Sequence, residues 1–253
     1  MTGNSALKLE AISPKVTPFF DKESNTFSYV VKDPDSDSCA IVDSVLDIEY
    51  ASGGISYESA DGIIRFVEDN KLTVEWIIET HVHADHITGA HDLREKTGAE
   101  VVYGAEAKEP CSDVDIADNE TLQFGKYTIR ALSTPGHTDG CTSYLIENMV
   151  FTGDTLMIQG CGRTDFQQGS PAAMYENVHQ KLFTLPDMTQ VYPAHDYKGR
   201  SVSSIGEEKK FNPRLGMGKT KEEFKEIMDN LNLAKPKKID VAVPANMKCG
   251  KTD

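Results

Sequence analysis

The chain has 253 residues, of which 39% are hydrophobic, and its formal net charge at pH 7 is −14. A chain of this length can bury a sizeable core in one or two domains, whereas its acidic excess argues against nucleic acid or an anionic membrane as partner, since both need a cationic surface. Residues 1–15 contain no apolar h-region of a secretory signal, and no run approaches the ~20 apolar residues of a membrane helix.

The first half of the chain predicts a mixture of strands and helices. Apolar side chains between residues 57 and 70 recur at helical spacing, whereas short apolar runs bounded by turn residues indicate strands. Residues 106–118 are mostly polar and are expected to form a loop. The expected elements are strands at 27–32, 39–43, 72–79 and 100–103 and helices at 57–70 and 90–96, the second of which Gly98 ends.

The second half continues the mixed pattern. Ser170-Pro171 predicts a helix start, because proline fits the first turn, and Met174, Val178 and Leu182 then fall on one helical face. Together the two halves favour a mixed α and β protein. The other expected elements are strands at 121–124, 127–133, 142–146, 149–152 and 190–192 and helices near 203–210 and around 224–231.

Residues 81–86 read His-Val-His-Ala-Asp-His, directly after the predicted strand 72–79. Three of the chain's seven histidines and one carboxylate thus fall within six positions. Imidazole suits zinc, iron or copper, and carboxylate suits harder ions, so we interpret the cluster as part of a metal centre rather than as a polar turn. Three further candidate ligands follow other strand-like runs, at turns that contain Gly or Pro: His137, Asp154 and His195.

The residue types leave the number of metals open. Two histidines and one carboxylate around one metal leave coordination positions free, as in non-haem Fe(II) enzymes that activate O₂. If all candidates bind, two metals fit, and a bridging hydroxide would attack a carbonyl as in metallohydrolases. The seven candidates are His81, His83, Asp85, His86, His137, Asp154 and His195.

This order of ligands resembles the metallo-β-lactamase superfamily over nearly the whole chain. The resemblance implies an α/β fold, a four-layer αββα sandwich, in a single domain at 1–253. Within it, 196–253 would be a C-terminal extension of helix and loop that shapes the substrate site. Four segments resemble the persulfide dioxygenase (sulfur dioxygenase) branch in particular: residues 160–169, 193–197, 212–215 and 243–250.

The same resemblance implies a mononuclear non-haem iron dioxygenase. One Fe(II) per chain would be bound by His81, His137 and Asp154, the catalytic residues. The reaction implied is the oxidation of glutathione persulfide by O₂ and water to sulfite and glutathione, a step of sulfide catabolism, and the family suggests a homodimer. The remaining candidates would orient and tune these ligands, or hold a second metal: His83, Asp85, His86 and His195.

A basic segment interrupts the acidic chain. Glutathione carries two carboxylates, which a chain of charge −14 should repel, yet residues 198–219 contain six basic and two acidic side chains. Arginine pairs with a carboxylate through two parallel hydrogen bonds. Tyr197 and Arg214 match positions that the family uses near glutathione, so we expect both to contact the substrate, unless the segment is merely a solvated face. Arg163 would either line the site or hold its loop through an ion pair.

Three other functions remain open. A glutathione thioester hydrolase of the glyoxalase II type, with two metals, has the same fold and ligands. However, residues 164–168 depart from the glyoxalase stretch, and the segment after His195 is short for that family's C-terminal domain. A lactonase or β-lactamase would lack a glutathione site, and the missing export signal argues against a β-lactamase. A non-catalytic iron or persulfide sensor would need an effector segment, which the sequence does not resemble.

The five cysteines are odd in number and widely spaced, and none forms a Cys-x-x-Cys pair. This distribution indicates reduced cysteines in the cytoplasm or, in a eukaryote, in the mitochondrial matrix. Most of them are expected to be small buried hydrophobic side chains. A redox role is a hypothesis only for Cys161 and Cys249.

Overall fold

The computed structural model describes residues 13–49 and 54–251, whose longer strands form two six-stranded sheets. The prediction that no secretory signal leads the chain falls mainly on residues 1–12, outside the described part. Within that part, no helix is long and apolar enough to cross a membrane. The first sheet contains, in spatial order, β1 (Lys15–Asp21), β2 (Thr26–Lys32), β3 (Ser38–Val42), β6 (Thr73–Ile78), β7 (Glu100–Gly104) and β8 (Val114–Ile116).

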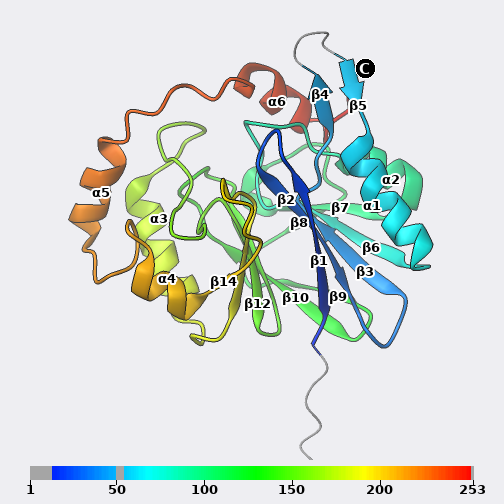
Figure 1. The fold of residues 1–253 in the computed structure, drawn as a ribbon, viewed down its shortest axis with the longest axis horizontal. Helices are drawn as coiled ribbons and strands as arrows, with labels where there is room; N and C mark the ends of the chain where they lie inside the picture. Colours follow the sequence, from blue (N-terminus) through cyan, green and yellow to red (C-terminus); the bar gives the residue numbers. More distant parts are fainter. Residues whose placement is uncertain (1–12, 50–53, 252–253) are drawn as a thin grey trace, which may run out of the picture.

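The second sheet packs against the first, and helices cover both outer faces (Figure 1). Its spatial order is β14 (Ser203–Ser204), β13 (Gln190–Pro193), β12 (Met149–Gly153), β11 (Thr142–Ile146), β10 (Tyr127–Ser133) and β9 (Thr121–Phe124). The short strands β4 (Asp47–Glu49) and β5 (Gly54–Ser56) pair separately. The helical elements are α1 (Glu58–Asp69), α2 (Ala90–Thr97), η1 (Ala105–Ala107), α3 (Pro171–Asn177), η2 (Val178–Leu182), α4 (Ile205–Phe211), α5 (Lys221–Asp229) and α6 (Ile239–Asn246).

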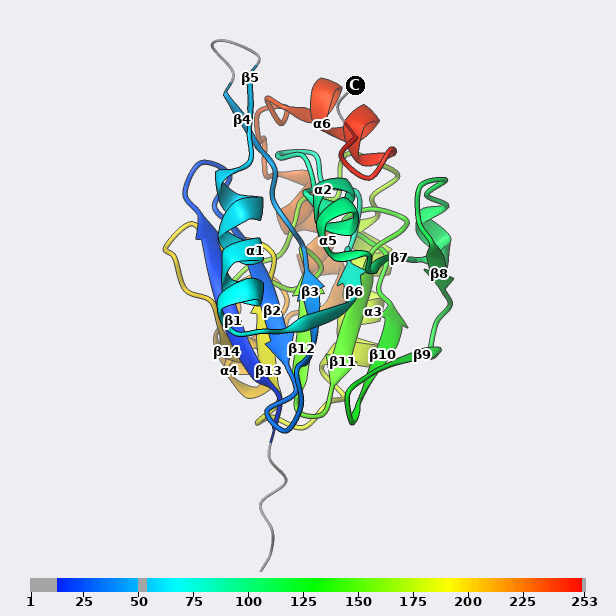
Figure 2. The same ribbon diagram turned by 90° about the vertical axis from the view of Figure 1, so that its right-hand side faces the viewer.

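Alternation along the strands builds three apolar layers, because successive side chains point to opposite faces of a sheet. In β2, Tyr29 and Val31 belong to the layer between the two sheets, whereas Val30 belongs to the layer beneath α1 and α2. A third layer joins the second sheet to α3 and α5, with Met174 and Phe224 fully buried in it. The order helix, sheet, sheet, helix confirms the predicted αββα sandwich (Figure 2).

Several predicted elements differ from the structure for local reasons. Residues 106–118 are not all loop, because β8 pairs with β7 and extends the first sheet. The helix that starts at Pro171 changes to a π-helix at Val178. The helix expected near 203–210 starts later, because residues 203–204 pair with β13 as β14. β1 and α6 have no counterpart among the predicted elements; β1 is an edge strand, and α6 contains Pro244.

Two cysteines form a disulfide, Cys111–Cys249, whose Cα atoms lie 5.7 Å apart. The prediction of reduced cysteines is therefore wrong for this pair. The 138 residues between them hide the pairing in the sequence, because only the fold brings the loop before β8 against the chain after α6. The free cysteines are buried, as small hydrophobic side chains are; they are Cys39, Cys141 and Cys161.

Glu109 lies two residues before Cys111 and makes the free energy of unfolding depend on pH. The residue is 6% exposed, and burial, with repulsion from Asp115 and Asp139, raises its pKa from 4.5 to about 7. The folded state therefore binds the proton more tightly than the unfolded chain, and stability falls as pH rises from about 4.5 to about 7. Glu109→Gln should remove this loss and raise the free energy of unfolding at pH 8, relative to wild type, by on the order of 1 kcal/mol.

Urea unfolding at pH 5 and pH 8 measures the effect. The variant should lose less stability than wild type between the two values. Glu106→Gln, at an exposed position in the same segment, serves as the matched control and should leave the pH dependence unchanged. An identical pH dependence in Glu109→Gln and wild type would contradict the assignment.

Candidate metal centre

Loops from both sheets carry the predicted ligands to a common site. β3 and β6 are parallel, as are β12 and β13, and the carboxyl ends of parallel strands meet at one edge of a sheet. Each ligand thus follows a strand that has buried side chains near its carboxyl end. Residues 81–86 follow β6, His137 follows β10, Asp154 follows β12, and His195 follows β13.

The structure brings all seven predicted ligands together in two groups. Within each group, one ligand atom from every residue lies within 4.8 Å of the others. The residue types alone left this division open, whereas the family resemblance implied the same two groups of residues. The first group is His81, His137 and Asp154, and the second is His83, Asp85, His86 and His195.

The two histidines of the first group are held through their Nδ1 atoms. His81 Nδ1 lies 3.0 Å from Thr80 Oγ1, and the Nδ1–H of His137 donates to the carbonyl oxygen of Arg163 at 2.7 Å. These contacts leave each Nε2 as the nitrogen that can bind a metal. Burial lowers the pKa of His81 well below its usual value, and the neighbouring His83 and His137 lower it further. A neutral imidazole is the form that coordinates a metal.

His195 links the two groups by bridging two carboxylates. Its Nδ1 lies 2.6 Å from Asp154 Oδ1, and its Nε2 lies 2.7 Å from Asp85 Oδ2. Burial alone would lower the pKa of His195, but the two carboxylates outweigh it and hold that pKa well above its usual value. The positive charge of His195 in turn outweighs the effect of burial on Asp154 and lowers the pKa of that carboxyl. Both ring nitrogens of His195 are therefore occupied by carboxylates rather than directed at a free position.

Two nitrogens of the second group remain unsatisfied. His83 Nδ1 and His86 Nε2 are buried and have no hydrogen-bond partner in the described part of the chain. Leaving a buried polar atom unpaired costs about 1–3 kcal/mol, so such atoms are rare without a function. These unpaired nitrogens mark the second group as a place where a second metal would fit. The two imidazoles and one carboxylate of the first group form a donor set that fits iron or zinc.

Asp43 is a functional residue that the sequence analysis missed. Its carboxylate accepts hydrogen bonds from the backbone N–H and the hydroxyl of Thr80 at 2.8 and 2.9 Å, and lies 3.4 Å from His83 Nε2. It therefore orients His81 through Thr80 and contacts His83 directly. A signal was present, because Asp43 follows β3 just as the ligands follow other strands of the sheets.

A cavity of about 590 Å³ borders the site. Its lining includes Asp85, His137, Asp154 and His195 from the two groups. The predicted substrate contacts line it as well: Arg163, Tyr197 and Arg214. Only part of the basic segment 198–219 contributes to the cavity: Lys198, Arg200 and Arg214 border it, and the other basic residues of the segment do not.

Arg163 connects two segments at the cavity. It forms an ion pair with Asp165 at 2.6 Å, and its guanidinium donates to the carbonyl oxygens of Ala234 and Leu233 at 2.7 and 3.3 Å. The ion pair considered as an alternative to substrate contact is thus present. Arg214 Nη1 donates to the carbonyl oxygen of Cys161 at 2.8 Å. This hydrogen bond holds one side of the Arg214 guanidinium against the loop that contains Cys161 and Arg163.

Comparison with known proteins gives a consistent result. The model of the metallo-beta-lactamase superfamily matches residues 21–195. The human protein "Persulfide dioxygenase ETHE1, mitochondrial" is 42% identical over 238 residues, which cover 91% of this chain and 87% of the human one. The crystal structure of ETHE1 from Myxococcus xanthus superimposes with a TM-score of 0.86 at 45% identity, and covers 94% of this chain and 100% of its own. "Glyoxylase B2" from Dictyostelium discoideum is 34% identical over an alignment of 266 residues, which covers 93% of this chain and 91% of the Dictyostelium protein.

Proposed function

The chain belongs to the metallo-beta-lactamase superfamily, and within that family we propose that it is a persulfide dioxygenase. The observation that carries the proposal is the 42% identity to the human persulfide dioxygenase over 91% of the chain. The identity of 34% to the protein named as a glyoxylase is lower. In the proposed reaction, glutathione persulfide, O₂ and water give glutathione, sulfite and two protons.

The metal that we propose is one Fe(II) per chain, bound by His81, His137 and Asp154. The fixed Nδ1 atoms of the two histidines and the lowered pKa of the carboxyl support this assignment. Ferrous iron held there would supply the open coordination positions and the redox activity that O₂ activation needs, while the terminal sulfur of the persulfide supplies the four electrons that reduce O₂. The second group would lie around this iron and hold its ligands in position. Its members are His83, Asp85, His86 and His195, and His195 would hold Asp154 through a contact of 2.6 Å.

The glutathione part of the substrate would occupy the cavity. Its two carboxylates are matched there by Arg214 and Lys198, and Tyr197 offers a hydroxyl. We propose that residues 196–253 shape this site as an extension of a single domain, because much of the cavity lining comes from them. The protein would thereby bind the thiol substrate, direct its terminal sulfur toward the ligand groups and limit the access of water.

Oxygen consumption by the Fe(II)-loaded protein with glutathione persulfide tests the proposal. Rapid uptake with sulfite formed in step is the expected result. A sample that contains one iron per chain but consumes no O₂ would refute it. Hydrolysis of a glutathione thioester by the same protein loaded with two metals would then favour the thioester hydrolase.

Arg214→Ala should raise KM for glutathione persulfide about 10-fold and lower kcat much less. The lost guanidinium pairs with a part of the substrate that does not react, so binding weakens uniformly along the reaction. Steady-state O₂ uptake at varied persulfide concentrations measures both constants, and Arg214→Lys, which keeps the charge, should fall between wild type and Arg214→Ala.

Arg130→Ala provides the matched control, because Arg130 is exposed on β10 and does not line the cavity. Its KM should equal that of wild type. An unchanged KM in Arg214→Ala would remove Arg214 from the substrate site.

We place the reaction in the cytoplasm or, in a eukaryote, in the mitochondrial matrix. We also expect a homodimer, which sedimentation of the purified protein would test. Both compartments are reducing, so the state of the Cys111–Cys249 pair there depends on the local thiols.

A further inference from the structure

Asn246, the last residue of α6, contacts the backbone of the loop at residues 79–89, which contains the ligands at 81–86 and is called the ligand loop. The side chain is fully buried. Its Nδ2 donates to the carbonyl oxygens of His83 and His86 at 2.8 and 2.9 Å, and its Oδ1 accepts from the backbone N–H of Thr88 at 2.8 Å. These backbone partners are two acceptors and one donor, so the amide is satisfied in one orientation only. A single side chain thus connects three backbone groups of the loop.

The loop depends on this contact because it lies between regular elements. β6 ends at Ile78 and α2 begins at Ala90, so the backbone groups between them need partners outside a ladder or a helix. Loss of the Asn246 donors would leave buried carbonyl oxygens at two ligand residues, His83 and His86. The loop would relieve these unpaired groups by moving, and its imidazoles would move with it.

The chain after Asn246 continues along the same loop. The carbonyl oxygen of Cys249 accepts a hydrogen bond from the backbone N–H of His91 at 2.9 Å. Gly250 has a φ of +80°, and a Cβ at this position would overlap the carbonyl oxygen of Thr88. Residues 246–250 therefore form a clasp over the ligand loop.

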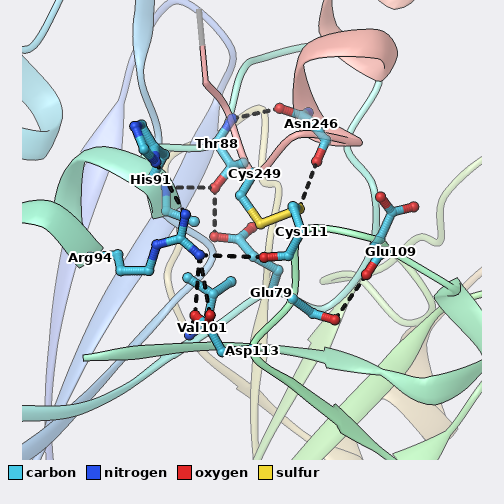
Figure 3. Close-up of a disulfide and its surroundings, with 12 residues drawn as sticks. Glu79, Thr88, His91, Arg94, Val101, Glu109, Cys111, Asp113, Asn246 and Cys249 are labelled. Carbon is cyan, nitrogen blue, oxygen red and sulfur yellow. Dashed lines mark hydrogen bonds and ion pairs between the residues drawn. A yellow bond between two sulfur atoms is a disulfide. The ribbon is translucent and has the colours of Figure 1, made fainter. Parts of the chain in front are cut away.

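The disulfide attaches the clasp to a different part of the fold (Figure 3). Cys249 lies within the clasp, and its partner Cys111 lies just before β8 of the first sheet. The backbone at Cys111 is held by α2, because Arg94 Nη1 of that helix donates to the Cys111 carbonyl oxygen at 3.4 Å and forms an ion pair with Asp113. Because Asn246 and Cys249 are three residues apart, fixing Cys249 also restricts Asn246.

We propose that Asn246 is a positioning residue for the ligand loop, and that the Cys111–Cys249 disulfide sets how firmly the clasp holds it. A low-molecular-weight thiol, the class to which glutathione belongs, would open the disulfide. One thiolate attacks the sulfur of Cys111, the partly exposed residue of the pair, and the thiolate of Cys249 leaves and takes up a proton. A second thiol then releases Cys111 as a thiol and departs as the oxidised disulfide of the reagent, so that two electrons reach the protein.

Asn246→Asp tests the first part, because it keeps the shape of the side chain and removes both N–H donors. In the metal-free protein, amide hydrogen exchange at residues 84–91 should accelerate at least about 10-fold. In the Fe(II)-loaded protein, loss of iron to a chelator should accelerate by a similar factor. Asn230→Asp, at an exposed position that ends α5, is the matched control and should change neither rate. Wild-type exchange in a folded Asn246→Asp variant would overturn the positioning role.

Cys111→Ser tests the second part. This variant and thiol-treated wild type should both show faster exchange at residues 84–91, and thiol should have no further effect on Cys111→Ser. Unchanged exchange in both would overturn the role of the disulfide, even if Asn246→Asp behaves as expected. The inference rests on the proposed function only for iron retention, and the exchange measured on metal-free protein separates the two. A protein that shows these changes but never oxidises persulfide would refute the dioxygenase and retain the clasp.

Discussion

Replacement of His137 with alanine should lower kcat/KM for persulfide-dependent O₂ uptake by more than about 100-fold, beyond the 10–100-fold typical of changing a partner behind a metal ligand. The variant loses one of the three residues of the first ligand group. His137 Nε2 also lies 3.6 Å from Asp154 Oδ2, so the carboxylate loses its neighbour on that side. Iron content per chain, measured together with the O₂ rate, should fall in parallel.

His179→Gln is the control for this experiment. His179 packs on Tyr175 with ring centroids 4.0 Å apart, and its Nε2 contacts the carbonyl oxygen of Leu215 at 3.1 Å, away from the cavity. Its iron content and its rate should remain those of wild type. If His137→Ala retained one iron per chain and the wild-type rate, His137 would not be a ligand.

Gly162→Ala should lower kcat about 100-fold while the protein still folds, which is the loss expected from a misplacement of about 1 Å at a reacting centre. A Cβ at Gly162 would lie 2.8 Å from His137 Nδ1 and 2.8 Å from the carbonyl oxygen of Asp154. Two residues of the first ligand group would therefore have to shift. The hydrogen bond from His137 to the Arg163 carbonyl oxygen, which orients the ring, would be lost or bent.

Gly62→Ala is the matched control, because its Cβ would meet only the end of the Arg65 side chain, 3.8 Å away. Within α1, alanine is favoured over glycine by roughly 0.5–1 kcal/mol, so this variant should be slightly more stable and equally active. Circular dichroism separates misfolding from a local shift at Gly162. A wild-type kcat in folded Gly162→Ala would mean that this loop does not position the ligands.

Local pattern accounts for the elements that the sequence predicted well. The strand at Tyr127–Ser133 has the expected bounds because a Gly-Lys turn separates it from Thr121–Phe124 and its buried side chains alternate. The ligands could also be predicted, since each follows a strand at a turn. The same rule applied to Asp43 would have added it to the site.

Contacts between distant parts of the chain account for what the sequence did not predict. His195 bridges Asp154 and Asp85 through its two ring nitrogens, and these carboxylates are 41 and 110 positions away in the sequence. Asn246 lies in residues 243–250, which only the family resemblance distinguishes in the sequence, and its partners are about 160 residues earlier. No periodicity marks α6, a short helix with an internal proline, so neither its existence nor its role as a support could be inferred.

The order of synthesis imposes a delay on the site. The ribosome makes the ligand loop 160 residues before it makes Asn246, the side chain that holds His86. At about 5–20 residues per second, the loop waits roughly 10–30 s for its support. Until then the carbonyl oxygen of His86 lacks the donor that holds it, so these contacts of the ligand loop are completed only after the C-terminal segment has been made.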